Sequence, residues 1–582
     1  MLAVLLNMAR EWIRPSLGFL LGGVILVLTG IIPGEILLEG FSNRQILTLF
    51  LLIWITAALR DQFDVMRKLD RFFASARSPR RFTLRMGLLV GGLSSVLNNT
   101  PIVALMIPYI NNWGKRMGIH PSKLLIPLSF IAISGGMITL IGTSTNLVLN
   151  GFLEQNQLPL LGFGQFLVPG LMVTIAVLVF FITVGHRLLP DHPEPLESWA
   201  GNAREYLVET RVSETSRVIG KSIQDAGLRQ LRGMFLLEII RNQRVIAPVG
   251  PHEILESGDA LVFVGQPDTI IDLVDADNGL DLNEQHHFEL SEERALVEAV
   301  ITANSDLAGQ RVRESNFRER FGAGIVAIHR NGERLRGKIG EVRLQSGDLL
   351  LLSIGQSFRA DQPRFKELYV VSELREDVPK KSGRIWWFCA GILAIILGAI
   401  GAQWDMFTAF SLALLWLLII GFTRMGQLKK ELDLDLLFLL IGALALSEGF
   451  IRSGLAHSMA NALLQITALW GETGALVGLF LLTLMLTSFI TNAAAVAISF
   501  PLAYSASIEG TLPAGLYFTT IAFAASCAFI TPMSYQTNLM IYGPGGYKMS
   551  DFIRVGVPVT VVYALAFAGA VALDAWIPWI KS

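Results

Sequence analysis

Charged residues and cysteines are scarce in this sequence. Of its 582 residues only 16% are charged, whereas about a quarter are charged in an ordinary soluble protein. The two cysteines, Cys389 and Cys527, both lie in apolar runs, which excludes a disulfide framework or a cysteine metal cluster. A net charge of −1 and a pI near 6.7 give no basic footprint, so we expect no nucleic-acid partner. The 52% of apolar residues instead predicts a chain that lies mostly in a lipid bilayer.

Long apolar runs occur at both ends of the chain but not in its middle. Runs that approach the length needed to cross a bilayer, about 20 residues, lie near residues 17–33, 45–59, 124–150, 165–185, 386–402, 405–423, 434–451, 513–542 and 555–577, with two more at 86–110 and 476–505. Between 188 and 383 the sequence shows short alternating segments, glycines and charges. We therefore expect an all-α polytopic membrane protein with an aqueous insert. Residues 1–14 lack the basic start and cleavage site of a removable signal peptide, and whether they form a membrane helix stays open.

Lys and Arg residues set the expected orientation, because basic loops stay on the cytoplasmic side of a membrane. Eight of them lie between 60 and 85: Arg60, Arg67, Lys68, Arg71, Arg77, Arg80, Arg81 and Arg85. The loop after 86–110, NNWGKRMGIHPSK, is basic too. Both ends of 86–110 therefore face the cytoplasm, which predicts a re-entrant hairpin. The same count places the insert in the cytoplasm, and we expect a protein of the bacterial inner membrane.

The two membrane halves resemble each other. Three pairs of segments match: LFLLI at 49–53 and 437–441, SVLNNTPIVALMIP at 95–108 with SFITNAAAVAISFP at 488–501, and TNLVLNG at 145–151 with TNLMIYG at 537–543. Their separations of 388, 393 and 392 residues are nearly constant, so chance similarity between apolar segments is a poor explanation. Because the orientation count makes corresponding segments run in opposite directions, the repeats are inverted, as in secondary transporters.

The middle of 86–110 carries the polar sequence NNTP. Asn or Thr can cap a helix and Pro101 suits a first helical position, so one helical arm ends near Asn98 and another begins at Pro101. At this depth a broken helix is tolerated only where its backbone lines a cavity. The free N–H groups of one arm favour an anion and the free carbonyls of the other favour a cation. The pattern hydroxyl-x-x-x-polar-Asn occurs twice, at Ser94, Asn98 and Asn99 and at Thr487, Thr491 and Asn492. Polar contacts that merely hold helices together are the alternative explanation.

These motifs resemble those of the divalent anion:sodium symporters, whose paired Ser-Asn-Thr motifs at two opposed hairpin tips contact substrate and sodium. NNT at 98–100 matches the first motif with Asn in place of Ser, and TNA at 491–493 matches the second with Ala in place of Thr. GTSTN at 142–146 belongs to the same resemblance, which covers essentially the whole membrane part. It implies sodium-coupled transport, hairpins at 86–110 and 476–505, and a homodimer in the lipid bilayer.

The resemblance also assigns residues to sites. It implies one sodium site at Ser94, Asn98, Asn99 and Gly142. It implies a second sodium site at Thr487, Thr491, Asn492 and a carbonyl near Thr531 and Pro532. It implies that an inorganic or organic divalent anion contacts Asn98, Asn99, Thr100, Thr143, Thr145, Asn146, Thr491, Asn492, Thr537 and Asn538. Ala493 removes a hydroxyl that the family offers its substrate, so we favour sulfate over a dicarboxylate.

The insert is itself duplicated. RNQRVIAPVGPHEILESGD at 241–259 aligns with RNGERLRGKIGEVRLQSGD at 330–348. Each unit runs strand, polar turn, strand and GD before another apolar strand, which predicts a small α/β unit with hairpins. The units are similar to the C-terminal regulatory domains of RCK potassium-channel proteins, although hairpin-turn chemistry explains the RN and SGD matches more simply. A nucleotide ligand of the insert is implied only by that similarity, because no GxGxxG loop precedes a helix here.

The sequence thus predicts four parts: a first membrane repeat at 1–187, two regulatory units at 188–290 and 291–383, and a second repeat at 384–582. We expect a secondary active transporter with sodium as coupling ion and no cofactor, and not an enzyme, since the sequence suggests no Ser–His–Asp or Cys–His set. A dicarboxylate symporter, a sodium/proton antiporter, a ligand-gated channel and a ligand sensor remain as alternatives. A channel would need a carbonyl-lined filter, and no TVGYG-like run is present.

Overall fold

The structure is a computed structural model of the whole chain. It describes residues 15–60, 73, 78–192, 207–228, 234–242, 244–246, 249–250, 252–265, 280–282, 296–302, 305–330, 333–335, 339–354, 367–371, 387, 390–391, 394–395, 404–467, 470 and 472–574. The expectations for residues 1–14, and for most of the run 386–402, fall outside these ranges.

Helices make up the first membrane part. They are α2 (Pro15–Leu28), α3 (Glu35–Ser42), α4 (Arg44–Arg60), α6 (Pro79–Ser94), α7 (Asn99–Met117), α8 (Ser122–Gly136), α9 (Ser144–Gln155) and α10 (Gly164–Thr183), followed by a short 3-10 turn at Gly185–Arg187. Most predicted apolar runs are helical here. The short α3 has no long apolar run to reveal it, and the sequence did not predict it.

The second membrane part is also helical. Its described helices are α14 (Met406–Ile419), α15 (Met425–Glu431), α16 (Leu434–Arg452), α17 (Leu455–Thr467), α18 (Glu472–Thr487), α19 (Asn492–Glu509), α20 (Ala514–Ser526), α21 (Gln536–Tyr542) and α22 (Met549–Asp574). Within the described residues, four stretches are long and apolar enough to cross a membrane: Glu35–Ala58, Gly164–Thr183, Leu434–Arg452 and Met549–Leu573. Across the two parts, α2 packs against α16 and α10 against α22.

Two predicted runs are not continuous spans. The run 124–150 is interrupted between α8 and α9, and the run 513–542 is interrupted between α20 and α21. Both interruptions are mostly apolar, and each contains a threonine, Thr139 or Thr531, that hydrogen-bonds a free backbone carbonyl, so apolar composition alone could not reveal them. Each half therefore has two breaks, one at its hairpin tip and one in the following run.

The loop between α6 and α7 and the loop between α18 and α19, called here the first tip and the second tip, are bounded by corresponding residues. α6 ends at Ser94 and α18 at Thr487, while α7 begins at Asn99 and α19 at Asn492. Asn98 caps α7 by accepting from the N–H of Thr100 at 3.3 Å, and Thr491 caps α19 by accepting from the N–H of Ala494 at 3.4 Å. The second arm thus starts two residues before the predicted Pro101, because proline is tolerated throughout a first turn whose N–H groups lack acceptors.

One glycine in each half lets a long helix touch a break. A Cβ on Gly170 of α10 would lie 2.2 Å from the carbonyl oxygen of Met137, just after α8. A Cβ on Gly556 of α22 would lie 2.1 Å from the carbonyl oxygen of Phe529, just after α20. Met137 and Phe529 are 392 residues apart, the same separation as the TNL segments. The backbones approach so closely that no other residue fits.

The insert contains two antiparallel sheets of five strands. The first has the order β3-β2-β4-β1-β5 and the second the order β10-β6-β9-β7-β8. Their strands are β1 (Leu207–Val212), β2 (Met234–Arg241), β3 (Arg244–Ile246), β4 (Ala260–Gly265), β5 (Leu280–Leu282), β6 (Leu296–Ile301), β7 (Ala323–Arg330), β8 (Glu333–Arg334), β9 (Leu349–Ile354) and β10 (Leu368–Val370). Read from opposite ends, the two orders are the same. Among the described insert residues the α-helical content is one short helix, α12 (Phe317–Phe321).

The duplicated RN and SGD sequences meet in each sheet. Arg241 binds Asp259 through Nε and Nη2, both at 2.8 Å, and Arg330 binds Asp348 in the same way at 2.7 and 2.8 Å. Both aspartates are 1% exposed, and the ion pair raises the pKa of Arg241. These bidentate pairs fix a strand end to a turn, a structural role that agrees with hairpin-turn chemistry.

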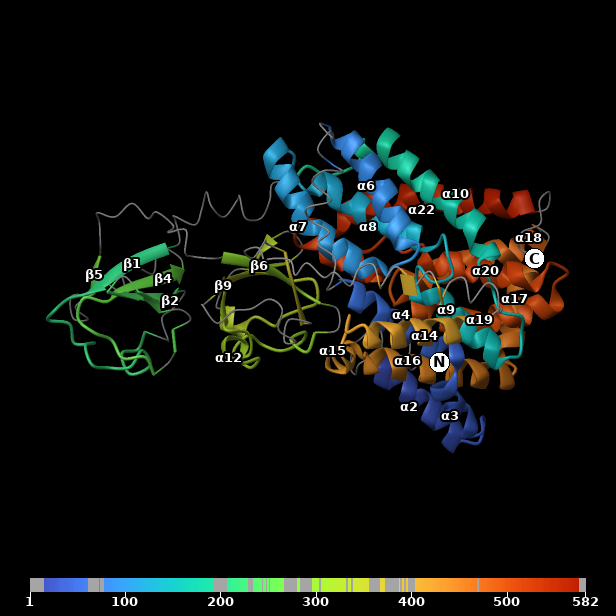
Figure 1. Ribbon diagram of the computed structural model, residues 1–582, viewed down its shortest axis with the longest axis horizontal. Helices are drawn as coiled ribbons and strands as arrows, with labels where there is room; N and C mark the ends of the chain where they lie inside the picture. Colours follow the sequence, from blue (N-terminus) through green and yellow to red (C-terminus); the bar gives the residue numbers. More distant parts are fainter. Residues whose placement is uncertain are drawn as a thin grey trace.

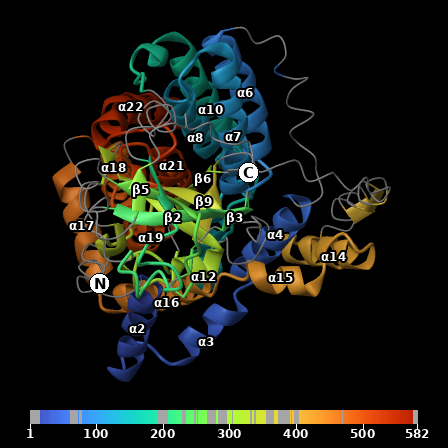
Figure 2. The same cartoon turned by 90° about the vertical axis from the view of Figure 1, so that its left-hand side faces the viewer.

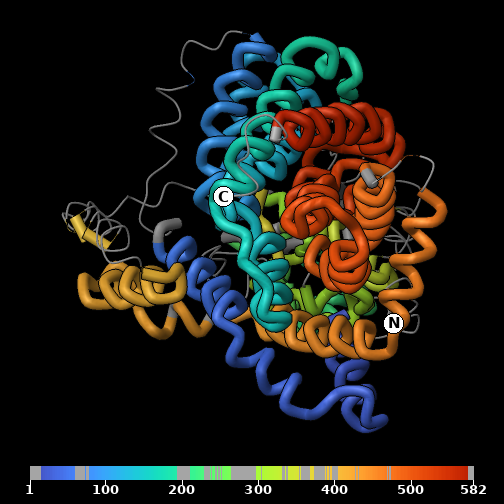
Figure 3. The backbone as a smooth tube through the Cα atoms, turned by 90° about the vertical axis from the view of Figure 1, so that its right-hand side faces the viewer, coloured from blue at the N-terminus to red at the C-terminus, as the bar shows by residue number. Residues whose placement is uncertain are grey.

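The described helices and sheets occupy different ends of the molecule (Figure 1). The two sheets lie at one end of the long axis, and the second sheet lies next to the helices. Seen from the sheet end, β6 and β9 overlie the middle of the helical body (Figure 2). From the opposite end, green and yellow segments of the insert are visible between the helices (Figure 3). The second sheet therefore covers the middle of one face of the helical body.

Candidate functional site

Backbone and amide groups from three segments meet beside the first hairpin tip. A Cβ on Gly142 would lie 2.4 Å from the carbonyl oxygen of Gly136 and 2.6 Å from that of Ser94. A Cβ on Gly136 would lie 3.0 Å from both amide atoms of Asn99. The end of α6, the start of α7 and the break after α8 thus converge on a space that only glycines leave open.

Two buried polar atoms in this cluster have no partner. The hydroxyl of Ser94 and the amide oxygen of Asn99 make no hydrogen bond within the described residues, and these side chains are 0% and 1% exposed. The NH2 group of Asn99 is occupied, because it donates to the Tyr535 hydroxyl at 3.1 Å. A buried acceptor left without a donor costs about 1–3 kcal/mol. A small hard cation, which prefers oxygen ligands, would satisfy these atoms.

The second tip holds a related cluster. Thr487 Oγ1 lies 2.8 Å from the Asn492 amide oxygen and 2.7 Å from the carbonyl oxygen of Ala525, and Asn492 Nδ2 has no partner among the described residues. A hydroxyl has one proton and cannot donate to both oxygens. With the Asn492 amide turned by 180°, its NH2 donates to Thr487, Thr487 donates to Ala525, and the amide oxygen becomes the free acceptor. The second tip then presents the same unpaired oxygen as Asn99.

Hydrogen bonds join the first hairpin arm to the break in the following run. Thr139 in the break donates its hydroxyl to the carbonyl of Ser95, at the end of α6. Asn146, in the first turn of α9, donates to the carbonyl of Thr139 at 3.2 Å. These bonds satisfy backbone groups that the interrupted helices leave free.

The same bonds recur in the second half. Thr531 donates to the carbonyl of Ser488 at 2.7 Å, and Asn538 Nδ2 lies 3.4 Å from the carbonyl oxygen of Thr531. Asn538 also donates to the carbonyl of Ala528 at 2.7 Å. Thr531, which the resemblance places at the second sodium site, therefore lies in the break beside the second hairpin tip, and Pro532 follows it in a 3-10 turn.

Some residues implied as anion contacts lie in packed surroundings. Thr145, Thr537 and Asn538 are at most 1% exposed. Ser129 of α8 lies 2.7 Å from the Thr537 hydroxyl and donates to the Asn538 amide oxygen at 2.7 Å, which ties α8 to α21. These contacts occupy the polar atoms of Asn538. Thr143, directly before α9, is 3% exposed and donates to Thr145 at 3.4 Å.

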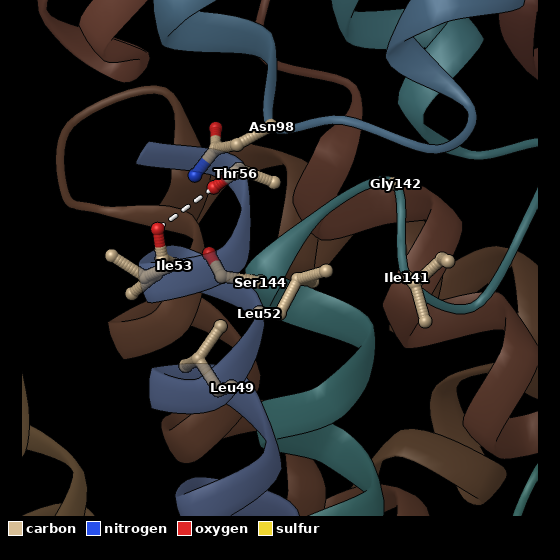
Figure 4. Close-up of a pocket in the computed structure, with 8 residues that line it drawn as sticks. All are labelled: Leu49, Leu52, Ile53, Thr56, Asn98, Ile141, Gly142 and Ser144. Atoms are coloured by element: carbon tan, nitrogen blue, oxygen red, sulfur yellow. Dashed lines mark hydrogen bonds between the residues drawn. The ribbon is translucent and has the colours of Figure 1, made fainter. Parts of the chain in front are cut away.

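A pocket opens beside the first tip (Figure 4). It is small, with a cavity volume of about 10 Å³, and it is lined by Leu49, Leu52, Ile53, Thr56, Asn98, Ile141, Gly142 and Ser144. Asn98 lies at the tip next to Thr56 of α4, and Ser144 begins α9. The Thr56 hydroxyl donates to the carbonyl of Ile53 at 2.9 Å. The repeated LFLLI sequence thus forms a wall of the pocket, a role that the sequence did not predict.

Two polar residues before Thr537 were also missed. The Tyr535 hydroxyl accepts from Asn99, and Gln536 Oε1 accepts from the Thr100 hydroxyl at 3.1 Å. Residues 435 or more positions apart therefore meet at the first tip. The repeat alignment places Tyr535 and Gln536 opposite Thr143 and Ser144. The residue types differ between the two halves, so the repeat did not mark these two positions.

The chemistry of this region is neutral. Hydroxyls, amides and backbone dipoles surround both tips, and no group of three His, Cys, Asp or Glu that could hold a metal ion occurs in the described part of the chain. Glu448, near the end of α16, accepts from Arg452 at 2.6 Å, and Arg452 is about half exposed. This pairing explains Glu448 as a helix-end ion pair.

Comparisons with known proteins show which family and which proteins this chain resembles. A family model described as citrate transporter (CitMHS) matches residues 3–516. The chain is 33% identical to a putative sulfur deprivation response regulator of Chlamydomonas reinhardtii over 93% of this chain and 95% of that protein. It is 31% identical to an uncharacterized transporter of Synechocystis over 96% of this chain and 93% of that one. A probable sodium/sulfate cotransporter of Chlamydomonas reinhardtii is 24% identical over 95% of this chain and 85% of its own length.

Proposed function

Because this chain belongs to the citrate transporter family, and is therefore a multi-pass membrane transporter and not an enzyme, we propose that it takes up a small divalent anion together with sodium, with sulfate preferred. The main observation in support of this proposal is the unpaired, fully buried Asn99 amide oxygen beside Ser94 and Gly142. Burying an acceptor without a donor is unfavourable unless a ligand completes it. The Ser94 hydroxyl, the Asn99 amide oxygen and the nearby carbonyl oxygens of Ser94 and Gly136 are oxygen ligands of the kind that suits sodium.

The anion would bind between the two tips. α7 and α19 both begin at a tip, with Asn99 and Asn492 as first residues, so their free N–H groups present positive helix ends. The Thr100 hydroxyl, in the first turn beside Asn99, donates to Gln536 Oε1 at 3.1 Å and would have to leave that partner to donate to the anion. A site without side-chain cations suits an anion whose charge is balanced by cations bound with it.

The choice of sulfate draws on the relatives and on Ala493. Sodium/sulfate cotransporters are among the similar proteins, and the family description names citrate. Ala493 offers no hydroxyl to a carboxylate at the second tip. A carboxylate substrate is therefore the competing specificity that an experiment must separate from sulfate.

Matched contacts support an inverted-repeat architecture for the membrane part. The helix boundaries at the two tips, the glycine contacts of α10 and α22, and the hydrogen bonds of Thr139 and Thr531 recur at a nearly constant separation. In transporters built from inverted repeats, broken helices meet at the binding site near mid-membrane. The cytoplasmic position of the insert, a homodimer and a nucleotide ligand of the insert belong to the same proposal.

Uptake into proteoliposomes tests this function. Purified protein would be given labelled sulfate, phosphate, succinate or citrate, with an inward sodium gradient or with potassium in place of sodium. We expect sodium-dependent sulfate accumulation that excess unlabelled succinate inhibits weakly. Sodium-dependent uptake of succinate or citrate without sulfate uptake would reassign the substrate, and the absence of uptake of all four anions would contradict the proposed function.

A further inference from the structure

The second inserted sheet packs on the helical body through the face opposite its own core. Successive residues of a strand point to opposite faces of a sheet. Ala299 and Leu350 lie in the core of the second sheet, whereas their neighbours Val300 and Leu349 join the core of the helical body. Val300 and Leu349 are a cross-strand pair of β6 and β9, and they are 1% and 3% exposed. The run LLLLSI of β9 is thus apolar on both faces because both faces are covered.

The surface that this face meets is α21 and the glycine after it. Leu349 packs on Gly543, where a Cβ would lie only 2.8 Å from the Leu349 Cβ. A Cβ on Gly347 would lie 3.1 Å from Leu539 of α21. The loop beyond Gly543 is held in turn by Tyr547, which donates to the carbonyl of Ser122 at 2.6 Å. The sheet therefore packs on a segment with little room to move.

Comparison with the first sheet shows that particular residues of the second sheet, and not the shared strand order, make this contact. Because the two sheets have the same strand order, β1 and β4 correspond to β6 and β9. The cross-strand pair at the position of Val300 and Leu349 is Arg211 and Ala260 in the first sheet, and Arg211 is exposed. The fold thus accepts an Arg–Ala pair at this position, but only the Val–Leu pair makes an apolar docking surface.

The other end of α21 reaches the candidate site. Tyr535 and Gln536, at its start, contact Asn99 and Thr100 of the first tip. The helix between this start and Gly543 has seven residues. A movement of the docked sheet and a movement of the first tip therefore both act on α21, which is short and rigid.

We propose that the second inserted sheet is an inhibitory domain that restrains α21 by docking the face that carries Val300 and Leu349 on the helical body, with Leu349 against Gly543 and Gly347 against Leu539. This inference rests on the proposed function, because it assigns a regulator to the same site. A transport cycle that moves the tip against α21 must first break this apolar contact, which slows the cycle. Release of the sheet, by a ligand or by mutation, frees α21 and speeds transport.

The decisive variant gives the second sheet the pair that the first sheet already carries, V300R/L349A. A buried unpaired arginine is unfavourable, so the sheet leaves the helical body while its own core stays intact. The matched control is the reciprocal variant R211V/A260L in the first sheet. We expect V300R/L349A to raise the initial uptake rate about fivefold or more, within the usual range of coupling between sites, and R211V/A260L to leave it unchanged.

A disulfide that locks the second sheet onto the helical body tests the opposite change, because it prevents release of the sheet. In a chain with C389A and C527A, the pair L349C/G543C brings two Cβ atoms close enough to bond after a shift of about 1 Å. We expect the oxidised protein to transport more slowly than the reduced protein, and mass spectrometry to find the linked peptides. Failure of this disulfide to form would contradict the docked arrangement.

Hydrogen exchange separates this inference from the proposed function, because it needs no transport. Backbone amides of 536–543 should exchange faster in V300R/L349A than in the wild type, while the control should match the wild type. Unchanged exchange would refute the restraint, and faster exchange with unchanged or slower uptake would refute the inhibitory role. Wild-type protein that transports none of the tested anions would refute the proposed function, whereas the disulfide and exchange results would still decide whether the sheet restrains α21.

Discussion

Asn99 and Asn492 occupy the same place in the two halves. Each is the first residue of a helix that follows a break, and each is almost completely buried. Most buried amides satisfy both of their polar atoms. Asn99 leaves its oxygen unpaired, and Asn492 leaves one amide atom unpaired in either orientation. Both atoms are available to a bound ligand, which is the role proposed for them above.

We therefore expect N99A and N492A each to reduce sodium-driven uptake about 10- to 100-fold, the loss that corresponds to one hydrogen-bonding or ion-binding ligand. The measurement is initial uptake by purified protein in liposomes, with the amount of folded protein checked by size-exclusion chromatography. N461A is the matched control, because Asn461 on α17 contacts His457 away from both tips. Uptake near the wild-type rate by either folded variant would contradict the site.

Residue-level prediction from the sequence succeeded where a residue type has a local physical role. A helix cap within NNTP was predicted because Asn and Thr cap helices, and the structure places it at Asn98, earlier than a helix start at Pro101 implied. Thr491, for which no cap was predicted from the sequence, caps α19 in the same way. Tyr535 and Gln536 could not be predicted in the same way. Their partners Asn99 and Thr100 are more than 400 residues away, and tertiary packing alone brings them together.

At the scale of elements, α10 and α22 hold the breaks in place through their glycines. Gly170 and Gly556 each lie against a backbone carbonyl in the break after an interrupted helix, that of Met137 after α8 and that of Phe529 after α20. We expect G170A and G556A to force these helices away from the breaks, at a cost of about 1–3 kcal/mol, and to reduce uptake as the tips lose their alignment. Thermal unfolding in detergent and initial uptake rates measure the two effects.

Gly569 gives a control on the same helix as Gly556. A Cβ there would lie 3.7 Å from the terminal methyl of Met172, an ordinary contact, so G569A should change neither the unfolding temperature nor uptake appreciably. Equal effects of G556A and G569A would mean that α22 is sensitive to any added methyl group, and the assigned contact would be wrong.

The elements themselves were only partly predictable. Long apolar runs gave the positions of α4, α10, α16 and α22, because burial in lipid requires such runs. The interruptions after α8 and α20 were not predicted, because carbonyl contacts and threonine hydroxyls stabilise them without changing the apolar composition. The amphipathic α17 was not predicted because its sequence mixes polar and apolar residues and so contains no long apolar run.

At the scale of the whole molecule, duplication explains both what could be predicted and what could not. Constant separations in the sequence pointed to two membrane halves and to two inserted units, and the inserted sheets do share one strand order. Copies of a fold diverge in their surfaces, however, and no sequence pattern predicted that the second sheet would pack on the helices. That contact depends on Val300 and Leu349 standing where the first sheet has Arg211 and Ala260.

The coupling ion follows from an absence in the four segments that form the two tips and the breaks beside them. The segments 86–110, 124–150, 476–505 and 513–543 contain no Asp, Glu, Lys, Arg or His. Proton-coupled transporters use ionisable side chains inside the membrane as relays. A site built of amides, hydroxyls and backbone dipoles cannot compensate a bound ionic charge, and an isolated charge in a medium of low polarity costs many kcal/mol. The bound ions must therefore balance one another.

A divalent anion with two or more sodium ions meets this requirement, and the two tips offer two places for the cations. We expect uptake to follow an imposed sodium gradient and, with sodium replaced by potassium or choline, to show no response to an imposed pH gradient. Proteoliposomes loaded at one pH and diluted into another, with membrane potential clamped by potassium and valinomycin, separate the two driving forces. Uptake that persists without sodium and follows the pH gradient would refute sodium coupling and support a proton-coupled mechanism, which would then need an ionisable group outside these four segments.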